Sequence, residues 1–165
     1  MKKSDYLILL STETPEQTQI SKADIIWLHT NPPSLGGFGW NRPGIDYLVT
    51  RDGHLETIIP EDSPNEVDLW GIREGSNLLG TARYLAYSGG RSEDGSQKKD
   101  TRTREQRASM AAVVKFYVRR FPDIQVLGFD QVPSKQGLNN PGFDVAKWCR
   151  SLGLSEANIY KPDDV

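Results

Sequence analysis

The feature that most limits the fold is a short, uninterrupted apolar run near the start of the chain, Tyr6-Leu7-Ile8-Leu9-Leu10. So few residues make a poor helix, whereas a continuous apolar run of this length is typical of a central strand that is buried on both faces. Residues 81–88 and 124–129 form further strand-like runs. The three runs together predict an α/β fold, in which helices cover a central sheet.

Helix signals separate these runs. A Ser-x-x-Asp capping box predicts a helix over residues 21–28, and a Thr-x-x-Gln box predicts the longest helix, over residues 103–121. A third helix is expected at residues 144–152, where Gly153 supplies the left-handed residue that commonly follows a helix. The two boxes therefore fix where two of the three helices begin.

The remaining segments are predicted from their turn chemistry. Asp52-Gly53 lies between two strand-like runs and predicts a β-hairpin, because this pair tolerates the positive φ angles of a tight turn. Residues 34–40 are rich in glycine and aromatics and are expected to form a shaped loop, and the polar residues 91–102 to form a solvated loop. The order β-α-β-β-β-α-β-α predicts a single mixed β-sheet flanked by helices, in one domain spanning residues 1–165.

Composition removes several classes of function. With 20 Lys+Arg against 22 Asp+Glu, the net charge is −2, which argues against general binding to nucleic acid or to an anionic membrane. No apolar run is long enough to span a bilayer or to form a signal-peptide core, so cytoplasmic synthesis without a signal peptide is expected. One cysteine and two histidines leave little material for a metal site.

Few single residues point to chemistry. His29 is expected to cap or pack a helix end, His54 to face solvent beside the hairpin, and Cys149 to act as a small apolar residue. Asp130 and Lys135 follow a strand and could line a cleft at its end, although a surface loop explains them equally well. The residues alone therefore predict an α/β domain with a cleft, and no reaction.

Seven stretches taken in order carry a resemblance to a known family: 6–14, 25–30, 44–53, 87–90, 100–106, 121–122 and 141–145. Their order and spacing resemble the zinc-dependent N-acetylmuramoyl-L-alanine amidases, the amidase-2 family that includes amidase-type phage lysozymes and peptidoglycan recognition proteins. The resemblance covers most of the chain. It implies the amidase-2/PGRP-like α/β fold, with a central sheet and flanking helices.

The positions that match the family's active residues have different side chains here. Leu10, Phe129 and Asn140 stand where the family has its zinc ligands, and Ile45 stands where it has its catalytic tyrosine. Lys135 could replace a family lysine that usually lies near the third ligand. Zinc needs imidazole, thiolate or carboxylate donors, which these three side chains lack. The resemblance therefore implies no bound zinc, no other cofactor and no catalytic residue besides Lys135.

The first functional hypothesis is a catalytically inactive amidase-fold protein of phage or phage-derived origin. It would act as a structural or protein-binding component, either a virion part or a regulator of another protein. This hypothesis is favoured because Phe129 and the lost tyrosine are expected to shrink or reshape the cleft. Its partner would be a protein or a viral assembly, with no nucleic acid and no membrane.

Two alternatives remain open. In the first, the chain binds peptidoglycan without cleaving it, through a cleft lined by Phe38, Trp40, Asp46, Asp130 and Asn140. In the second, the chain is an active amidase whose metal site has moved to His29, Asp46 and Asp130.

Overall fold

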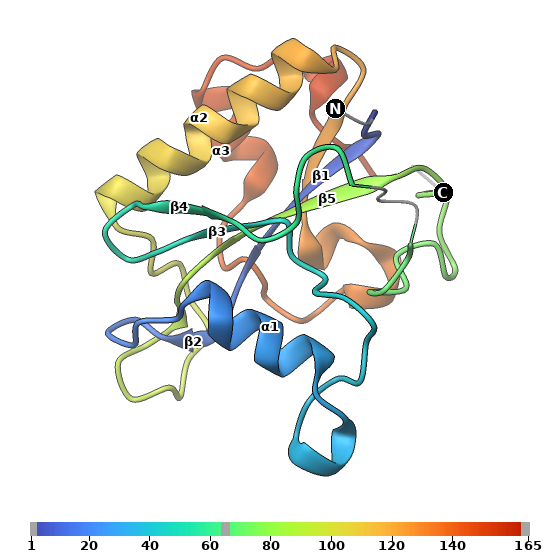
Figure 1. Cartoon of the computed structure of the whole chain (residues 1–165). Helices are drawn as coiled ribbons and strands as arrows, with labels where there is room; N and C mark the ends of the chain where they lie inside the picture. Colours follow the sequence, from blue (N-terminus) through green and yellow to red (C-terminus); the bar gives the residue numbers. More distant parts are fainter. Residues whose placement is uncertain (1–2, 64–66, 163–165) are drawn as a thin grey trace.

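A computed structural model of the chain describes residues 3–63 and 67–162. A five-stranded sheet with the order β4-β3-β5-β1-β7 forms its centre (Figure 1). These strands are β1 (Tyr6–Ser11), β3 (Tyr47–Val49), β4 (Leu55–Thr57), β5 (Ala82–Tyr87) and β7 (Gln125–Gly128). All neighbours pair in parallel except β3 and β4, which form an antiparallel hairpin. The short strands β2 (Thr14–Pro15) and β6 (Gly90–Arg91) pair in a separate small sheet.

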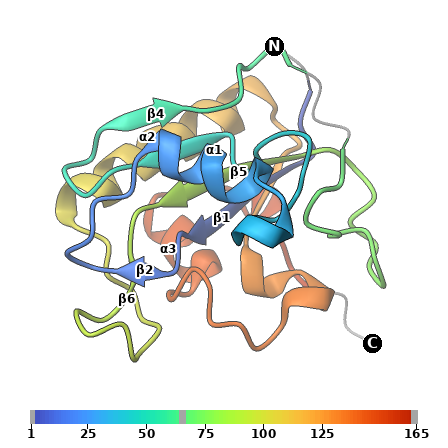
Figure 2. The same ribbon diagram turned by 60° about the horizontal axis from the view of Figure 1, so that its bottom comes forward.

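Helices cover both faces of the central sheet (Figures 1 and 2). Helix α1 (Lys22–Thr30) lies over one face, and α2 (Arg104–Arg120) and α3 (Val145–Ser151) lie over the other. Four one-turn 3-10 helices, η1 to η4, occupy the connections. They are Pro33–Leu35, Phe129–Gln131, Pro133–Lys135 and Glu156–Asn158.

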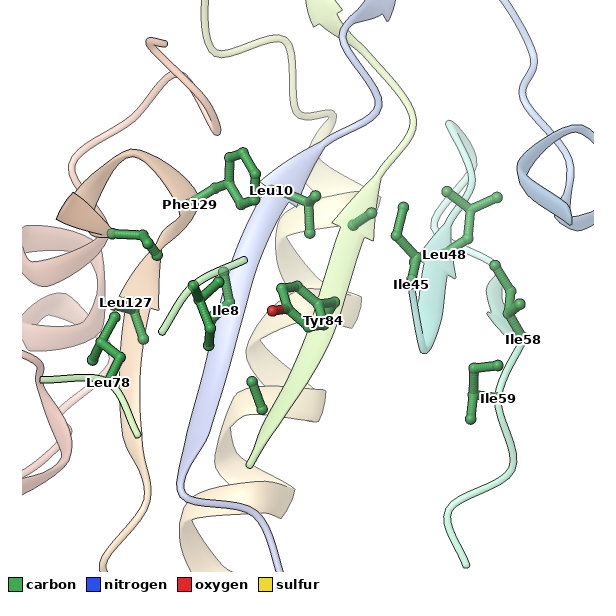
Figure 3. Packing of buried hydrophobic residues seen from close by; sticks show 14 of the residues in the cluster. Ile8, Leu10, Ile45, Leu48, Ile58, Ile59, Leu78, Tyr84, Leu127 and Phe129 are labelled. Atoms are coloured by element: carbon green, nitrogen blue, oxygen red, sulfur yellow. The ribbon is translucent and has the colours of Figure 1, made fainter. Parts of the chain in front are cut away.

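Strand β1 explains why the core has two layers. Successive side chains of a strand point to opposite faces. Ile8 and Leu10 therefore join the apolar cluster beneath α1, part of which Figure 3 shows, whereas Leu7 and Leu9 join the cluster beneath α2 and α3. All four are at most 2% exposed. An apolar run without alternation is what a strand covered on both faces requires.

The predicted fold class is confirmed, and so are the main elements. Both capping boxes form as predicted: the Ser21 side chain accepts a hydrogen bond from the Asp24 amide, and the Thr103 side chain accepts one from the Gln106 amide. The sheet contains each of the predicted strands. Helix α3 ends before Gly153, whose φ is 82°.

The hairpin turn differs from the prediction in one detail. Of the Asp52-Gly53 pair, only Gly53 has a positive φ, at 87°. Its amide donates to the Thr50 carbonyl at 2.8 Å, and the Thr50 amide donates to the His54 carbonyl at 2.9 Å. The turn therefore spans more residues than a two-residue loop, and only the glycine must adopt the left-handed conformation.

The prediction of a wholly solvated loop over residues 91–102 is wrong at its end. Thr101 and Arg102 are buried. The Thr101 hydroxyl accepts from the Gly90 amide at 2.7 Å, and the Arg102 guanidinium lies 3.3 Å from the centre of the Phe143 ring. The Thr101 side chain therefore holds the loop against β6, and the Arg102 side chain holds it against the segment before α3. Within residues 3–63 and 67–162, no helix is long and apolar enough to cross a membrane.

Candidate functional site

A cleft of about 400 Å³ opens at the carboxyl ends of β1 and β7, on the α1 side of the sheet. Ligand sites of α/β proteins commonly occupy this end of the strands, because the loops that leave the strands converge there. The lining residues are Leu10, Ser11, Thr12, Glu13, Ile25, Leu28, His29, Phe38, Ile45, Trp70, Arg91, Lys98, Phe129, Lys135, Leu138 and Asn140.

Four positions that the family resemblance singled out meet in this cleft. Leu10 lies near the end of β1, Phe129 directly follows β7, Ile45 precedes β3, and Asn140 lies in the loop before α3. Each is at most 4% exposed. Leu10 and Phe129 lie at the same end of the sheet (Figure 3). The three apolar side chains give the cleft a hydrocarbon floor.

The fourth position, Asn140, is occupied by an internal contact. Its Oδ1 accepts a hydrogen bond from the Ser11 amide at 2.7 Å, and its Nδ2 donates to the Ser11 carbonyl at 3.3 Å. Both ends of the side-chain amide therefore bind the backbone at the end of β1. Asn140 joins two segments that are 129 residues apart in the chain.

These residues do not fit a zinc site. Leu10 and Phe129 have no lone pair, and a neutral amide such as that of Asn140 is a poor ligand for this ion. Within the described ranges, no three His, Cys, Asp or Glu side chains come close enough together to hold a metal ion. Cys149 is buried under the opposite face of the sheet, and burial raises the pKa of its thiol to about 12.

His29 is the one histidine in the cleft wall, and its protonation state is set by its surroundings. The ring is 2% exposed, and its Nδ1 accepts a hydrogen bond from the Gly44 amide at 2.8 Å. Burial lowers the pKa of the imidazole from 6.5 to about 4. At neutral pH the ring is therefore uncharged, and because Nδ1 accepts, the proton lies on Nε2.

Aromatic rings surround His29 and fix its position. Phe38 stacks on it at 5.1 Å between ring centres, and Trp40 and Trp70 meet it edge-on at 5.0 and 5.5 Å. The Trp70 indole donates to the Gly44 carbonyl at 2.7 Å. A Cβ atom at Gly44 would lie 2.7 Å from the Trp40 ring and 2.8 Å from the Trp70 ring, so no larger residue fits there. We call His29, Phe38, Trp40 and Trp70 the aromatic cluster.

The rim of the cleft carries three cations and one acid. Lys98 pairs with Glu13 at 2.9 Å, and the Arg91 side chain donates to the Glu13 carbonyl at 3.1 Å. The Lys135 ammonium lies 5.9 Å from the centre of the Phe129 ring, and none of the ion pairs found among residues 3–63 and 67–162 includes it. Lys135 therefore contributes positive charge to the cleft and is not paired with any carboxylate of the described residues.

Two of the predicted lining residues lie elsewhere. Asp46 is buried in a separate, smaller cavity, where its carboxylate accepts hydrogen bonds from Arg83 and from the Tyr84 amide, both at 2.8 Å. Burial raises the pKa of Asp46, and these two donors partly offset the rise. Asp130 lines a third cavity beside α3, and burial raises the pKa of its carboxyl group as well.

The relocated metal site is therefore wrong, because His29, Asp46 and Asp130 lie in three different cavities. Trp40 packs against His29 in the aromatic cluster and does not line the cleft, whereas Phe38 and Asn140 do.

Sequence reasoning missed several residues of the cleft wall. Trp70 lies in a segment without a helix or strand pattern, so its position in the cleft wall could not be predicted from the sequence. Glu13 precedes β2 and Arg91 ends β6, and the pairing of these two short strands, together with a β-bridge between Arg91 and Lys98, brings the three side chains together.

No protein-family model matches the sequence, and a search of curated proteins finds no match. Solved structures do match. The N-acetylmuramoyl-L-alanine amidase LysC from Clostridium intestinale URNW is similar over 92% of this chain and 87% of its own, with a TM-score of 0.61 and 14% identity. A selenomethionine derivative of AmpD matches over 92% and 85%, with a TM-score of 0.59 and 20% identity.

A complex of tracheal cytotoxin with the ectodomains of the peptidoglycan recognition proteins LCa and LCx also matches, over 95% of this chain and 84% of that one, with a TM-score of 0.58 and 13% identity. At these identities the similarity is one of architecture. The chain therefore has the fold shared by N-acetylmuramoyl-L-alanine amidases and peptidoglycan recognition proteins.

Proposed function

We propose that this chain is a non-catalytic binding protein with an amidase fold, and that its cleft binds a peptidoglycan fragment without cleaving it. The observation that carries the proposal is a cleft that stays open although its floor has no catalytic side chain. Leu10, Ile45 and Phe129 occupy the positions that correspond, by the resemblance, to zinc ligands and a catalytic tyrosine. The cleft nevertheless retains about 400 Å³. The expectation that Phe129 and the lost tyrosine shrink or reshape the cleft therefore does not require that the cleft is closed to a ligand.

The charge and shape of the cleft support a carboxylate-bearing peptide as the ligand. Lys135 lies in the wall and forms no ion pair within the described residues, and Arg91 adds positive charge at the rim, where Lys98 is paired with Glu13. Pockets that hold small ligands typically combine apolar walls with a few polar groups that fix orientation. Here the apolar floor and Phe38 would contact aliphatic groups, and the cations would bind the carboxylates that peptidoglycan stem peptides carry.

The absence of ligands at the zinc positions supports a function without hydrolysis. A zinc amidase uses the metal to lower the pKa of a water molecule and to polarise the scissile carbonyl. The described residues offer no metal-binding group of three, and the thiol of Cys149 is buried away from the cleft. His29 is held neutral by burial, with its Nδ1 already bonded to Gly44, which suits a fixed hydrogen-bond donor at Nε2.

Co-sedimentation with purified peptidoglycan sacculi at about 0.15 M salt, where weak attraction between exposed charges is screened, tests the proposal. We expect saturable pelleting of the wild-type chain with no stem peptide released into the supernatant. Lys135→Glu is expected to weaken binding about tenfold, because it reverses a charge inside the cleft. Lys147→Glu is the matched control, because Lys147 is exposed on α3, away from the cleft.

Three outcomes would contradict the proposal. Absence of pelleting, or equal weakening by the two charge reversals, would exclude specific binding in the cleft. Release of stem peptides by the wild-type chain would show that it is an enzyme. The first hypothesis makes the chain a component of a phage particle. Co-sedimentation of the chain with intact virions in place of sacculi would test that association.

A further inference from the structure

A second hollow, of about 310 Å³, lies on the opposite face of the sheet, between α2 and the β3–β4 hairpin. Figures 1 and 2 both show β4 running alongside α2 at this edge of the sheet. Its lining residues are Tyr47, Leu55, Glu61, Ser109, Ala112, Val113, Phe116 and Tyr117. We call this hollow the α2 groove. It shares no residue with the cleft, so it is independent of the proposed peptidoglycan site.

The groove exposes apolar side chains that the fold itself does not cover. Phe116 is 46% exposed and Leu55 is 38% exposed, and they stand on opposite walls, one on α2 and one on β4. The phenol groups of Tyr47 and Tyr117 bind each other at 2.6 Å, and Tyr47 also donates to Glu61 at 3.3 Å. The Ser109 hydroxyl donates to the Gly53 carbonyl. The hydroxyl groups of the groove therefore already have partners, and the surface left for a ligand is mainly aliphatic and aromatic.

The helix that forms one wall is strongly basic. Although the whole chain has a net charge of −2, α2 carries five cationic residues and one acidic residue. The cations are Arg104, Arg107, Lys115, Arg119 and Arg120, and all of them are exposed. None of the ion pairs found within residues 3–63 and 67–162 includes any of them. An apolar hollow beside exposed cations that form no ion pair within the described residues is complementary to an acidic segment with a bulky apolar side chain.

We infer that the α2 groove is a docking site for an acidic segment of a partner protein, which inserts a tryptophan side chain between Phe116 and Leu55. Tryptophan fits because the groove is apolar and because the Glu61 carboxylate can accept a hydrogen bond from the indole N–H. The acidic residues on either side of that tryptophan then lie along Lys115 and Arg119.

Other occupants fit less well. In a symmetric dimer through this face, each α2 would meet the same basic surface of its partner, and like charges would oppose the contact. An anionic membrane would attract the cations, but a flat lipid surface would leave the concave groove unfilled, whereas a single inserted side chain fills it.

Two six-residue peptides test the inference with the full chain. One has the sequence Glu-Glu-Leu-Trp-Glu-Glu and the other Lys-Lys-Leu-Trp-Lys-Lys, each with blocked ends and a fluorescent label, and anisotropy gives the dissociation constants. We expect the acidic peptide to bind at least about tenfold more tightly than the basic one, and more weakly as salt rises. Amide chemical shifts in the ¹⁵N-labelled chain should change at the groove residues and not in the cleft.

Two variants separate the apolar part of the site from the charged part. Ala112→Trp fills the groove from the α2 wall and should abolish binding, and Lys115→Glu with Arg119→Glu should weaken it about tenfold. All three positions are exposed, so the fold should be retained, which circular dichroism verifies. Lys147→Glu on α3 is the control and should bind normally.

Equal binding of the two peptides would overturn the inference, as would shifts that map to the cleft or binding that survives Ala112→Trp. Binding of the chain to vesicles of phosphatidylglycerol, lost in Lys115→Glu with Arg119→Glu while the acidic peptide fails to bind, would assign the surface to lipid instead. Concentration-dependent dimerisation abolished by Ala112→Trp would assign it to a second copy.

Discussion

Acidification should destabilise this protein through His29 more than through any ordinary surface histidine. The imidazole is 2% exposed, and burial lowers its pKa from 6.5 to about 4. In the unfolded chain the ring has its ordinary pKa. As the pH falls below about 6.5, the imidazole therefore becomes protonated in the unfolded state while it stays neutral in the folded state. The free energy of unfolding is therefore not reduced by His29 above about pH 6.5, and it falls as the pH decreases from 6.5 toward 4.

The magnitude follows from the two pKa values. Linkage between protonation and unfolding gives a loss of about 2 kcal/mol between pH 7 and pH 5, and about 3 kcal/mol by pH 4. This is a large fraction of the 5–15 kcal/mol that is typical of domains, as an order of magnitude. Protonation of Nδ1 would also break the hydrogen bond from the Gly44 amide, because a protonated ring nitrogen cannot accept one.

Urea denaturation at pH 7.0 and pH 5.0 measures the effect, with His29→Asn as the reference variant. The asparagine Oδ1 can take the place of Nδ1 and accept from Gly44, but the side chain does not titrate. Other groups contribute equally to both proteins, so the difference between the two pH dependences isolates His29. If the wild-type chain loses no more stability than His29→Asn over this interval, the imidazole is not held neutral by burial and the reasoning is refuted.

Three further perturbations address the cleft and the core. The triple variant Leu10→His, Phe129→His, Asn140→Cys places zinc donors at the three family positions. Zinc at a concentration about 100-fold above its Kd should raise the free energy of unfolding of this variant by about 2–3 kcal/mol and leave that of the wild type unchanged. A folded variant that does not bind zinc would contradict the assignment of these three positions. Phe129→Ala should cost about 3–5 kcal/mol in urea denaturation, because it opens a cavity in a buried cluster; a loss below 1 kcal/mol would mean that the ring is not packed. Asp46→Ala should cost about 3–5 kcal/mol by leaving the Arg83 guanidinium buried without its carboxylate, and adding Arg83→Met should recover part of that loss; no recovery would argue against a buried ion pair.

Local signals in the sequence were sufficient to predict the framework. The β1 run is apolar at every position because α1 covers one of its faces and α2 and α3 cover the other. The two capping boxes each satisfy backbone amides at a helix start, so their residues identify those starts without tertiary information. Elements of two residues, such as β2 and β6, carry no periodicity and were missed.

The cleft was harder to predict, because its contacts join distant segments. The Asn140 amide binds the Ser11 backbone across 129 residues, and nothing near either residue signals that contact. The position of Asp46 was equally hard to predict, because the residue lies at a bend before β3 and strand alternation does not extend to it. Its carboxylate there accepts hydrogen bonds from Arg83 and from the Tyr84 amide.

Trp70 is positioned so that its intrinsic fluorescence can report on ligand binding in the cleft. Its indole lines the cleft, contacts Phe129 and His29, and donates a hydrogen bond to the Gly44 carbonyl. A molecule that enters the cleft displaces water from one face of this ring, and the emission maximum should then move to shorter wavelength. Trp27, Trp40 and Trp148 do not line the cleft and set the background. Intrinsic fluorescence can therefore follow occupancy in solution without a label.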